Sequence, residues 1–207
     1  MYNHQFGYKT TGAPTAEAKG ALVMLHGRGS TATNIMSLSK ELSVADFAIY
    51  APQAANNSWY PYSFMAPDEQ NQPALNSALE VIGQLVNQIK KDGFTEDRIF
   101  FAGFSQGACL TLEYITRNAK VFGGAVAFTG SLIGEHTRQE NYNGNFNGTP
   151  VLITTGNPDP HVPLNRVNES VELLSRLGAN VTLKVYEGRP HTISMDEVEL
   201  ANKLIFA

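Results

Sequence analysis

The stretch "FFAGFSQGACL", residues 100–110, sets a single hydroxyl, that of Ser105, between two glycines, Gly103 and Gly107. The apolar run "RIFFA" that leads into it is typical of a buried strand, and "QGACLTLEYI" after the serine has the composition of a helix. The sequence therefore predicts a tight strand-to-helix turn, where the Ser105 oxygen projects beyond the sheet edge and the helix N-terminus stabilises negative charge. Side chains two residues to either side would collide in such a turn, so we expect the glycines to make room for the serine.

This turn alone is a weak indication of chemistry, because a glycine-rich turn with a capping serine has the same pattern. An unactivated serine needs a base, and the base needs a carboxylate that orients it. Both are expected at the ends of later strands, in the order serine, acid, histidine. Asp159 stands in "GNPDPHVP" after the strand-like run "VLITT", and His191 stands in "EGRPHTI" after "VTLKVY". Order and placement agree, so the sequence predicts a triad of Ser105, His191 and Asp159.

The other histidines are weaker candidates for the base. His161 also follows a strand-like run, but it lies two residues from Asp159, which favours a role in the loop or the pocket. His4 and His136 stand in polar stretches and are expected in solvent. His26 closes the run "ALVML" and is expected to shape the turn that follows.

An acyl-transfer site also needs backbone N–H groups that point to the oxygen of the tetrahedral intermediate. One is expected from the residue after the nucleophile, Gln106. The second is expected from the turn "HGRGS" after the first strong strand, where Gly27 and Gly29 allow close backbone approach and Arg28 offers its N–H.

Apolar runs rich in β-branched residues alternate along the chain with stretches of helical periodicity. Apolar residues recur at helical spacing over 74–91 and again over 167–177, and Ser194 and Glu197 have the spacing of a helix capping box. This alternation predicts an α/β fold, with a mostly parallel sheet flanked by helices on both faces and a binding site at the carboxyl ends of its strands. The strand-like runs are 21–25, 47–51, 98–102, 124–128, 151–155 and 181–186.

Two segments interrupt this alternation. Residues 134–149 are rich in Asn and Gly and are expected to form an exposed, mobile connection. Residues 52–73 carry large rings after a strand-like run, and should overhang the carboxyl edge near Ser105. Their side chains either wall a pocket or pack as core beneath the loop. The predicted pocket residues are Trp59, Tyr60, Tyr62, Phe64, Met65 and, from the later loop, His161.

The composition limits the class of protein. With 207 residues, 43% hydrophobic and 16% charged, the chain suits one globular domain over residues 1–207. A formal net charge of −4 disfavours nucleic acid and anionic membranes as partners. The N-terminal stretch "MYNHQFGYKTTG" is polar and no run is long enough to span a membrane, so we expect no secretory signal, no membrane span and a cytoplasmic location. The single cysteine, Cys109, excludes an internal disulfide and favours a buried apolar role.

Taken together, "LHGRGS", "GFSQGA", "GNPDPHVP", "GRPHTI" and "SWYPYSF" resemble the α/β-hydrolase superfamily, and within it the phospholipase/carboxylesterase family, which includes the acyl-protein thioesterases. The similarity covers nearly the whole chain. It implies an α/β-hydrolase fold, the triad named above, and the amides of Arg28 and Gln106 as oxyanion donors. The chain departs from the family at Ser30, where an acidic residue is common, and at Tyr60 and Pro61, where Phe and Asp are common. It also has no long insertion, which implies a minimal lid.

The sequence therefore predicts a serine carboxylesterase that hydrolyses small, short-acyl esters without a metal or cofactor. Two alternatives stay open. One is action as an acyl-protein thioesterase or lysophospholipase. The other belongs to a different class, a catalytically silent hydrolase fold that binds a ligand or partner. The sequence leaves the oligomeric state open, a homodimer included.

Overall fold

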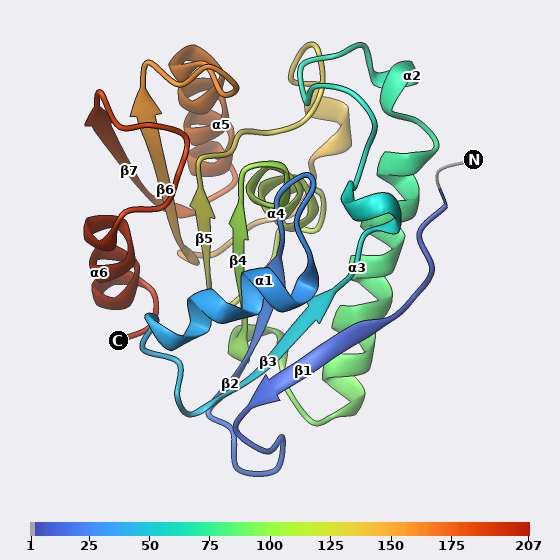
Figure 1. Ribbon diagram of the computed structural model, residues 1–207, viewed down its shortest axis with the longest axis vertical. Helices are drawn as coiled ribbons and strands as arrows, with labels where there is room; N and C mark the ends of the chain where they lie inside the picture. Colours follow the sequence, from blue (N-terminus) through green and yellow to red (C-terminus); the bar gives the residue numbers. More distant parts are fainter. Residues whose placement is uncertain (1–2) are drawn as a thin grey trace.

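A seven-stranded sheet with the spatial order β1-β3-β2-β4-β5-β6-β7 forms the centre of the computed structural model, which describes residues 3–207 (Figure 1). Within that range β1 runs antiparallel to β3, and every other pair of neighbouring strands is parallel. The carboxyl ends of β2 to β7 therefore meet at one edge of the sheet. The strands are β1 (Tyr8–Gly12), β2 (Gly20–Leu25), β3 (Phe47–Pro52), β4 (Ile99–Phe104), β5 (Gly124–Phe128), β6 (Pro150–Asn157) and β7 (Asn180–Glu187).

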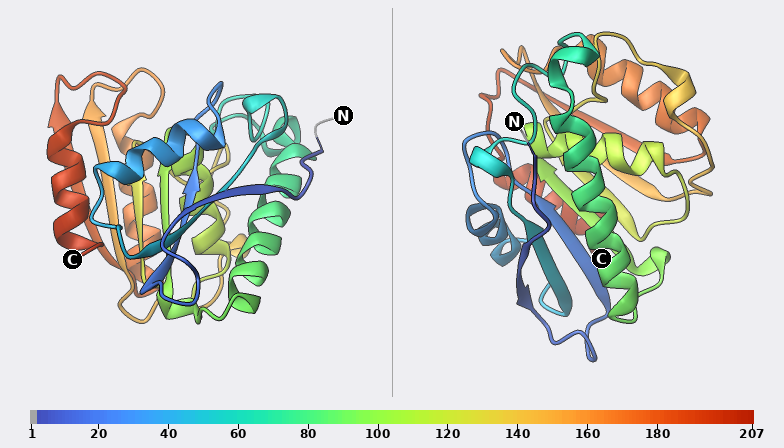
Figure 2. Two further views of the ribbon diagram at one scale, coloured as in Figure 1. Left: turned by 60° about the horizontal axis from the view of Figure 1, so that its bottom comes forward. Right: turned by 90° about the vertical axis from the view of Figure 1, so that its right-hand side faces the viewer.

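Helices cover both faces of this sheet, α1 and α6 on one and α3, α4 and α5 on the other (Figure 1 and Figure 2). Strand β2 is buried throughout, with Val23 and Leu25 facing the second group of helices and Leu22 and Met24 facing the first. None of the helices within residues 3–207 combines the length and the apolar character that crossing a bilayer requires. The helices are α1 (Ala32–Ser37), α2 (Asp68–Asn71), α3 (Ala74–Lys91), α4 (Gln106–Arg117), α5 (Leu164–Arg176) and α6 (Met195–Leu204).

The predicted α/β architecture is confirmed, and several elements lie where their periodicity indicates. Each of the six strand-like runs forms a strand, with bounds within two residues of those expected. Helix α3 has the predicted bounds, with eight apolar residues buried along one face. Ser194 and Glu197 form the predicted capping box at the start of α6.

Several short elements, among them strand β1 and helices α1 and α2, have no clear signal in the sequence. Strand β1 reads "YKTTG" and is exposed after its first residue, because it is an edge strand with one side toward solvent. Helix α1 is six residues long and buries only Ala32 and Ile35, so it is too short to develop an apolar stripe.

The expectation of an exposed connection over 134–149 is wrong for part of that segment. Phe146 and Tyr142 are buried in the core behind α4. The Tyr142 hydroxyl donates a hydrogen bond to Glu113 Oε2 at 3.0 Å, and Glu113 is itself buried on α4. Burial of Tyr142 and Phe146 therefore holds in place a segment whose Asn and Gly content suggests mobility.

Candidate active site

Ser105 lies between β4 and α4 with backbone angles φ 54° and ψ −118°. A non-glycine residue in this region is strained and persists only where its surroundings hold it. The Ser105 N–H donates to the Phe128 carbonyl of β5 at 3.0 Å, and the Ser105 carbonyl accepts from the Cys109 N–H of α4 at 3.0 Å. The serine thus occupies a strained strand-to-helix turn at the carboxyl edge of the sheet, as the pattern predicts.

The two flanking glycines are required by close backbone contacts. A Cβ on Gly103 would lie 2.3 Å from the carbonyl oxygen of Gly107, and a Cβ on Gly107 would lie 2.1 Å from the carbonyl oxygen of Leu25. Both obstacles are backbone atoms, which cannot move aside without displacing β2 or α4. The glycines therefore allow the start of α4 to dock against the end of β2 with the serine exposed on top.

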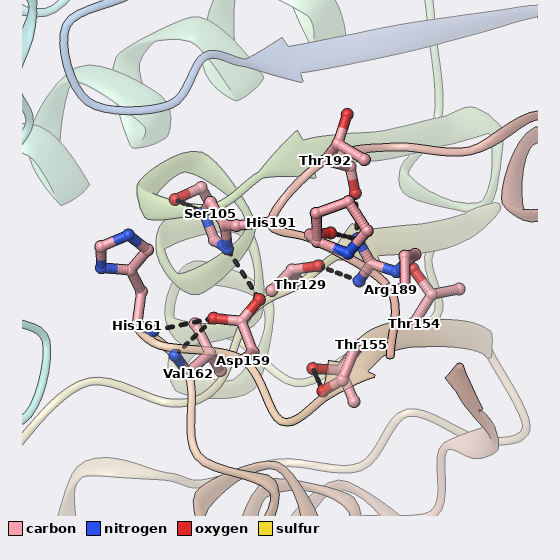
Figure 3. A network of polar contacts seen from close by, with 12 residues as sticks. Ser105, Thr129, Thr154, Thr155, Asp159, His161, Val162, Arg189, His191 and Thr192 are labelled. Carbon is pink, nitrogen blue, oxygen red and sulfur yellow. Dashed lines mark hydrogen bonds and ion pairs between the residues drawn. The ribbon is translucent and has the colours of Figure 1, made fainter. Parts of the chain in front are cut away.

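His191 and Asp159 meet Ser105 from two different loops (Figure 3). Asp159 follows β6, and His191 lies in the loop between β7 and α6. His191 Nε2 is 2.8 Å from Ser105 Oγ, and His191 Nδ1 is 2.8 Å from Asp159 Oδ2. An ionised carboxylate only accepts hydrogen bonds, so Nδ1 carries the proton and Nε2 of the neutral ring accepts from the serine hydroxyl.

Asp159 is held as a carboxylate. Burial raises its pKa, but hydrogen bonds from His191 and from the N–H groups of His161 and Val162 more than offset this, so the pKa of Asp159 lies below its usual value. The two N–H groups donate to Oδ1 at 2.8 and 2.9 Å, leaving Oδ2 for His191. The carboxyl group thus has a fixed orientation, with one oxygen assigned to the loop and the other to the imidazole.

Arg28 and Gln106 line the same cavity as Ser105. Neither backbone N–H takes part in the hydrogen bonds found within residues 3–207. Gln106 is the first residue of α4, where an N–H has no partner inside the helix. Gln106 and Arg28, the predicted oxyanion donors, thus both line the cavity that contains Ser105.

The side chains of these two residues hold the loop after β3. Arg28 Nη1 donates to the Pro61 carbonyl at 2.8 Å, and Arg28 Nη2 donates to the Tyr62 carbonyl at 2.5 Å. Gln106 Oε1 accepts from the Trp59 N–H at 2.8 Å. The side chains of Arg28 and Gln106 thus both bind loop 58–62.

A cavity of about 800 Å³ opens over Ser105. Its wall includes Tyr60, Tyr62, Phe64 and His161, four of the six predicted pocket residues. The other lining residues include apolar side chains and side chains with hydroxyl, amide and guanidinium groups. The full set is Gly27, Arg28, Ser30, Asn34, Tyr60, Pro61, Tyr62, Ser63, Phe64, Phe104, Ser105, Gln106, Cys109, His161, Val162 and His191.

Trp59 and Met65 do not line this cavity, which corrects the prediction for both. Trp59 is fully buried, and its indole Nε1 donates to the His26 carbonyl at 2.9 Å. Met65 is partly buried against the core. Trp59 is thus core beneath the loop, the alternative interpretation of the aromatic segment, because its N–H finds a buried partner there.

The expectation that His4 lies in solvent is also wrong, since His4 is buried and packs on Trp59. Its Nε2 donates to the Trp59 carbonyl at 2.8 Å, and its Nδ1 accepts from the Ala55 N–H at 3.0 Å. His26 also packs on Trp59, with ring centroids 5.0 Å apart, and its Nε2 accepts from the Ala54 N–H at 3.1 Å. Burial lowers the pKa of both histidines, which keeps them in the neutral form that these contacts require.

His161 stands beside the imidazole of His191 without reaching the serine. The two rings meet edge to face, with centroids 4.8 Å apart and planes at 72°. His161 is exposed, and its backbone N–H binds Asp159. His161 therefore lies in the cavity wall, beside the proposed base and not in its place.

The cavity wall contains residues that the sequence does not indicate as pocket residues. Phe104 packs on the His191 ring with centroids 5.2 Å apart, and Cys109 reaches the cavity from the first turn of α4. Val162 follows the acid loop, and Ser30 and Asn34 join from the α1 side. Burial raises the pKa of the Cys109 thiol to about 11. The only signal for these residues is their closeness in sequence to the motif residues.

The site contains no arrangement of metal ligands. Residues 3–207 have no group of three or more His, Cys, Asp or Glu side chains close enough together to hold a metal ion. The two cavity histidines contact protein groups instead, His191 through Asp159 and Ser105 and His161 through the His191 ring.

This sheet, with a serine at the turn after β4 and with acid and histidine loops after later strands, is the architecture of the α/β-hydrolases. The model of the phospholipase/carboxylesterase family matches residues 7–206. The chain belongs to that family.

Individual relatives agree with this placement. The crystal structure of a phospholipase/carboxylesterase from Dyadobacter fermentans is 59% identical, with a TM-score of 0.99 over 100% of this chain and 99% of that one. Acyl-protein thioesterase 1 of Debaryomyces hansenii is 30% identical, covering 94% of this chain and 93% of its own length. Carboxylesterase SOBER1 of Arabidopsis thaliana is 25% identical, covering 88% of this chain and 87% of its own. The family and these names indicate a serine hydrolase of the carboxylesterase type that acts on ester bonds.

Proposed function

We propose that this protein is a serine carboxylesterase that hydrolyses small esters with short acyl groups. Ser105 is the nucleophile, His191 transfers the proton, and Asp159 orients His191. The observation that carries the proposal is the continuous chain of two 2.8 Å hydrogen bonds from Ser105 Oγ through His191 to Asp159. The two hydrogen bonds place His191 within reach of the serine proton and Asp159 within reach of the far side of the imidazole.

In the first half of the reaction, Ser105 Oγ attacks the ester carbonyl carbon while its proton passes to His191 Nε2. The imidazolium that forms is stabilised by Asp159, which stays ionised because its pKa is lowered. Collapse of the tetrahedral intermediate transfers the Nε2 proton to the leaving alkoxide and leaves an acyl-serine. Water then attacks this ester with His191 again as the base, and the carboxylic acid is released.

The negative oxygen of each tetrahedral intermediate is held by the backbone N–H groups of Arg28 and Gln106. Both residues line the cavity that contains Ser105, and Gln106 adds the positive end of the α4 dipole. The anchoring of loop 58–62 by the two side chains supports this role, because it limits movement of the backbone that carries the donors.

Preference for short acyl groups follows from the composition of the cavity wall. Its apolar part consists of Tyr60, Phe64, Phe104, Cys109 and Val162. Each methylene buried there contributes about 0.8 kcal/mol of binding free energy. A longer acyl chain extends beyond these side chains toward polar groups and solvent. There, further carbons stay in contact with water and contribute no binding free energy. The optimum is therefore expected at about C2 to C6, by the same burial argument.

Action as an acyl-protein thioesterase or lysophospholipase is the second candidate. The similarity to the acyl-protein thioesterase of Debaryomyces hansenii favours it, because that relative covers nearly the whole chain. The same serine chemistry cleaves a thioester, so the distinction lies in the fit of a long acyl chain to the cavity. A catalytically silent binding fold is disfavoured by the complete hydrogen-bonded chain at Ser105.

Labelling with a fluorophosphonate probe tests the proposed chemistry, because the probe reacts only with an activated serine. Wild type is expected to be labelled once, at Ser105, and Ser105→Ala to be unlabelled while keeping the circular dichroism spectrum of wild type. Absence of labelling in the folded wild type would support the silent binding fold instead.

A further inference from the structure

A buried ion pair lies next to the loop that carries His191. Arg189, two residues before His191, has its Nε 3.4 Å from Glu197 Oε2 on α6, and their side chains are only 7% and 0% exposed. Taking two charges out of water costs about as much free energy as their attraction returns, so such a pair is a weak source of stability. The hydrogen bonds of the two side chains indicate instead which neighbouring segments the pair holds in place.

Glu197 connects the start of α6 to the sheet. Its Oε2 accepts from the Ser194 N–H at 2.8 Å and from Ser194 Oγ at 3.0 Å, which closes the capping box. Its Oε1 accepts from Thr154 Oγ1 of β6 at 2.5 Å. The carboxylate therefore fixes the end of the His191 loop relative to β6, the strand that leads to Asp159.

Arg189 binds the backbone of the loop that carries His191 (Figure 3). Its Nη1 donates to the Pro190 carbonyl at 2.9 Å and also to the Thr192 carbonyl, the residues immediately before and after His191. Its Nη2 donates to Thr129 Oγ1 at 2.6 Å. One guanidinium thus joins both sides of His191 to the segment after β5.

Thr129 completes the connection. Its N–H donates to the Thr154 carbonyl at 2.7 Å, so Arg189, Thr129, Thr154 and Glu197 form a closed ring. Thr129 has φ 59°, a conformation that is costly for a β-branched residue and persists only where contacts impose it. It directly follows Phe128, whose carbonyl accepts from the Ser105 N–H. The ring therefore touches the segments next to all three proposed catalytic residues.

Resting on the proposed function, we propose that Arg189, together with Glu197 and Thr129, is the device that positions His191 between Ser105 and Asp159. None of the three borders the cavity, so they act through the backbone of residues 190–192 and not on the substrate. Gly156 at the end of β6 belongs to the same arrangement, because a Cβ there would lie 2.5 Å from the Arg189 carbonyl oxygen.

A matched pair of substitutions at Thr129 tests the role with little change in shape. Thr129→Val removes the oxygen that accepts from Arg189 Nη2, and Thr129→Ser keeps it. We expect Thr129→Val to lower kcat for p-nitrophenyl butyrate about tenfold, with KM within about threefold, because a small misplacement of the base affects chemistry more than binding. Thr129→Ser should keep kcat within about threefold of wild type on the same reasoning.

Arg189→Met and Glu197→Gln remove the charges themselves. Each should lower kcat by about 10- to 100-fold and slow fluorophosphonate labelling of Ser105 by a similar factor. Because the residues act as one unit, the double variant should be no slower than the slower single variant by more than about threefold.

Glu113→Gln is the control for loss of a buried carboxylate. Glu113 is fully buried and ion-paired with Arg117 at 2.6 Å, and it contacts Ile133 and Tyr142 and not the His191 loop. This variant should lower the melting temperature as the Glu197 variant does, but keep kcat within about threefold of wild type.

Full kcat in folded Thr129→Val and Arg189→Met would overturn the positioning role, as would an equal loss of kcat in Glu113→Gln. If Arg189→Met does not fold, the comparison of Thr129→Val with Thr129→Ser decides alone. Failure of the proposed function itself has a different signature, namely activity that survives in Ser105→Ala.

Discussion

Gln106 and Arg28 bind the same loop from two different elements. Gln106 Nε2 donates to the Tyr60 carbonyl at 2.8 Å, and Arg28 Nη1 donates to the next residue's carbonyl, that of Pro61, also at 2.8 Å. These are the residues whose own backbone N–H groups we propose as oxyanion donors. The wall of the cavity and the proposed stabilisation of the intermediate therefore depend on the same two residues, the first through their side chains and the second through their backbone N–H groups.

Gln106→Ala is expected to weaken the wall while leaving its own N–H in place. Loss of the contacts to Trp59 and Tyr60 frees the loop that carries part of the pocket. We expect KM for p-nitrophenyl butyrate to rise by roughly five- to tenfold and kcat to fall by less than about tenfold. Steady-state kinetics measure both, and a kcat loss of about a thousandfold with unchanged KM would assign the side chain itself to the chemistry.

Ser105, His191 and Asp159 are expected to act as a unit. His191→Ala should lower kcat by about 10⁴ or more, and combining it with Ser105→Ala should lower the residual rate no further. The measurement is p-nitrophenyl acetate hydrolysis against buffer, with chromatography to exclude a contaminating esterase. Additive losses in the double variant would mean that the two side chains do not share one proton transfer.

His161→Asn is expected to keep kcat within about tenfold of wild type, because the His161 ring packs on His191 and makes no hydrogen bond with Ser105. Its backbone N–H, which binds Asp159, is unaffected by the substitution. If His161→Asn were as inactive as His191→Asn, the proposed assignment of the base would be incomplete.

The acyl-chain profile should depend on Phe64 and not on Trp59. Across p-nitrophenyl esters, kcat/KM is expected to peak at about C2 to C6 and to fall at C12 to C16. Phe64→Ala removes a ring from the cavity wall. The cavity becomes larger, and the peak should move to longer chains. Trp59→Ala, a matched ring deletion in the core, should lower stability by about 3–5 kcal/mol without moving the peak. A wild-type optimum at C16, or efficient cleavage of palmitoyl thioesters, would favour the thioesterase alternative.

Cys109 should resist alkylation in the folded protein. Burial raises its pKa to about 11, so at about pH 8 only on the order of one thiol in a thousand is ionised. Mass spectrometry after iodoacetamide treatment should show an unmodified native protein and one modification after denaturation in guanidinium, since the chain has a single cysteine. Rapid modification of the native protein would mean that the wall behind Tyr60 opens in solution.

The serine turn and the two loops that meet it can be predicted from the sequence, because the turn pattern and the order of the strand-end loops are both visible in short stretches of sequence. Gly103 meets the Gly107 carbonyl within the turn itself, although Gly107 in turn meets the Leu25 carbonyl of β2, and strand order alone brings the loops of Asp159 and His191 to the same edge. The main features of the candidate site can therefore be inferred from short stretches of sequence and the order in which they follow one another.

What the sequence does not reveal depends on contacts between distant segments. The prediction for Trp59 fails because aromatic loop residues have no periodicity that separates wall from core, and the burial of Trp59 depends on His4 and His26. The ring of Arg189 and Glu197 is hidden for the same reason, since Thr129 joins it from 60 residues away. Nothing local marks a buried ion pair in advance.

The long separation of the reacting side chains has a consequence for biosynthesis and refolding. His191 reaches Ser105 across 86 residues of sequence, from a loop that β7 and α6 support near the C-terminal end of the chain. Contacts this distant form late, because the intervening chain must be ordered first. Hydrolysis of a chromogenic ester should consequently be the last native property to return during renaturation, and a ribosome-bound chain lacking its final strand and helix should be inactive. A catalytic assay can thus serve as a reporter of complete folding.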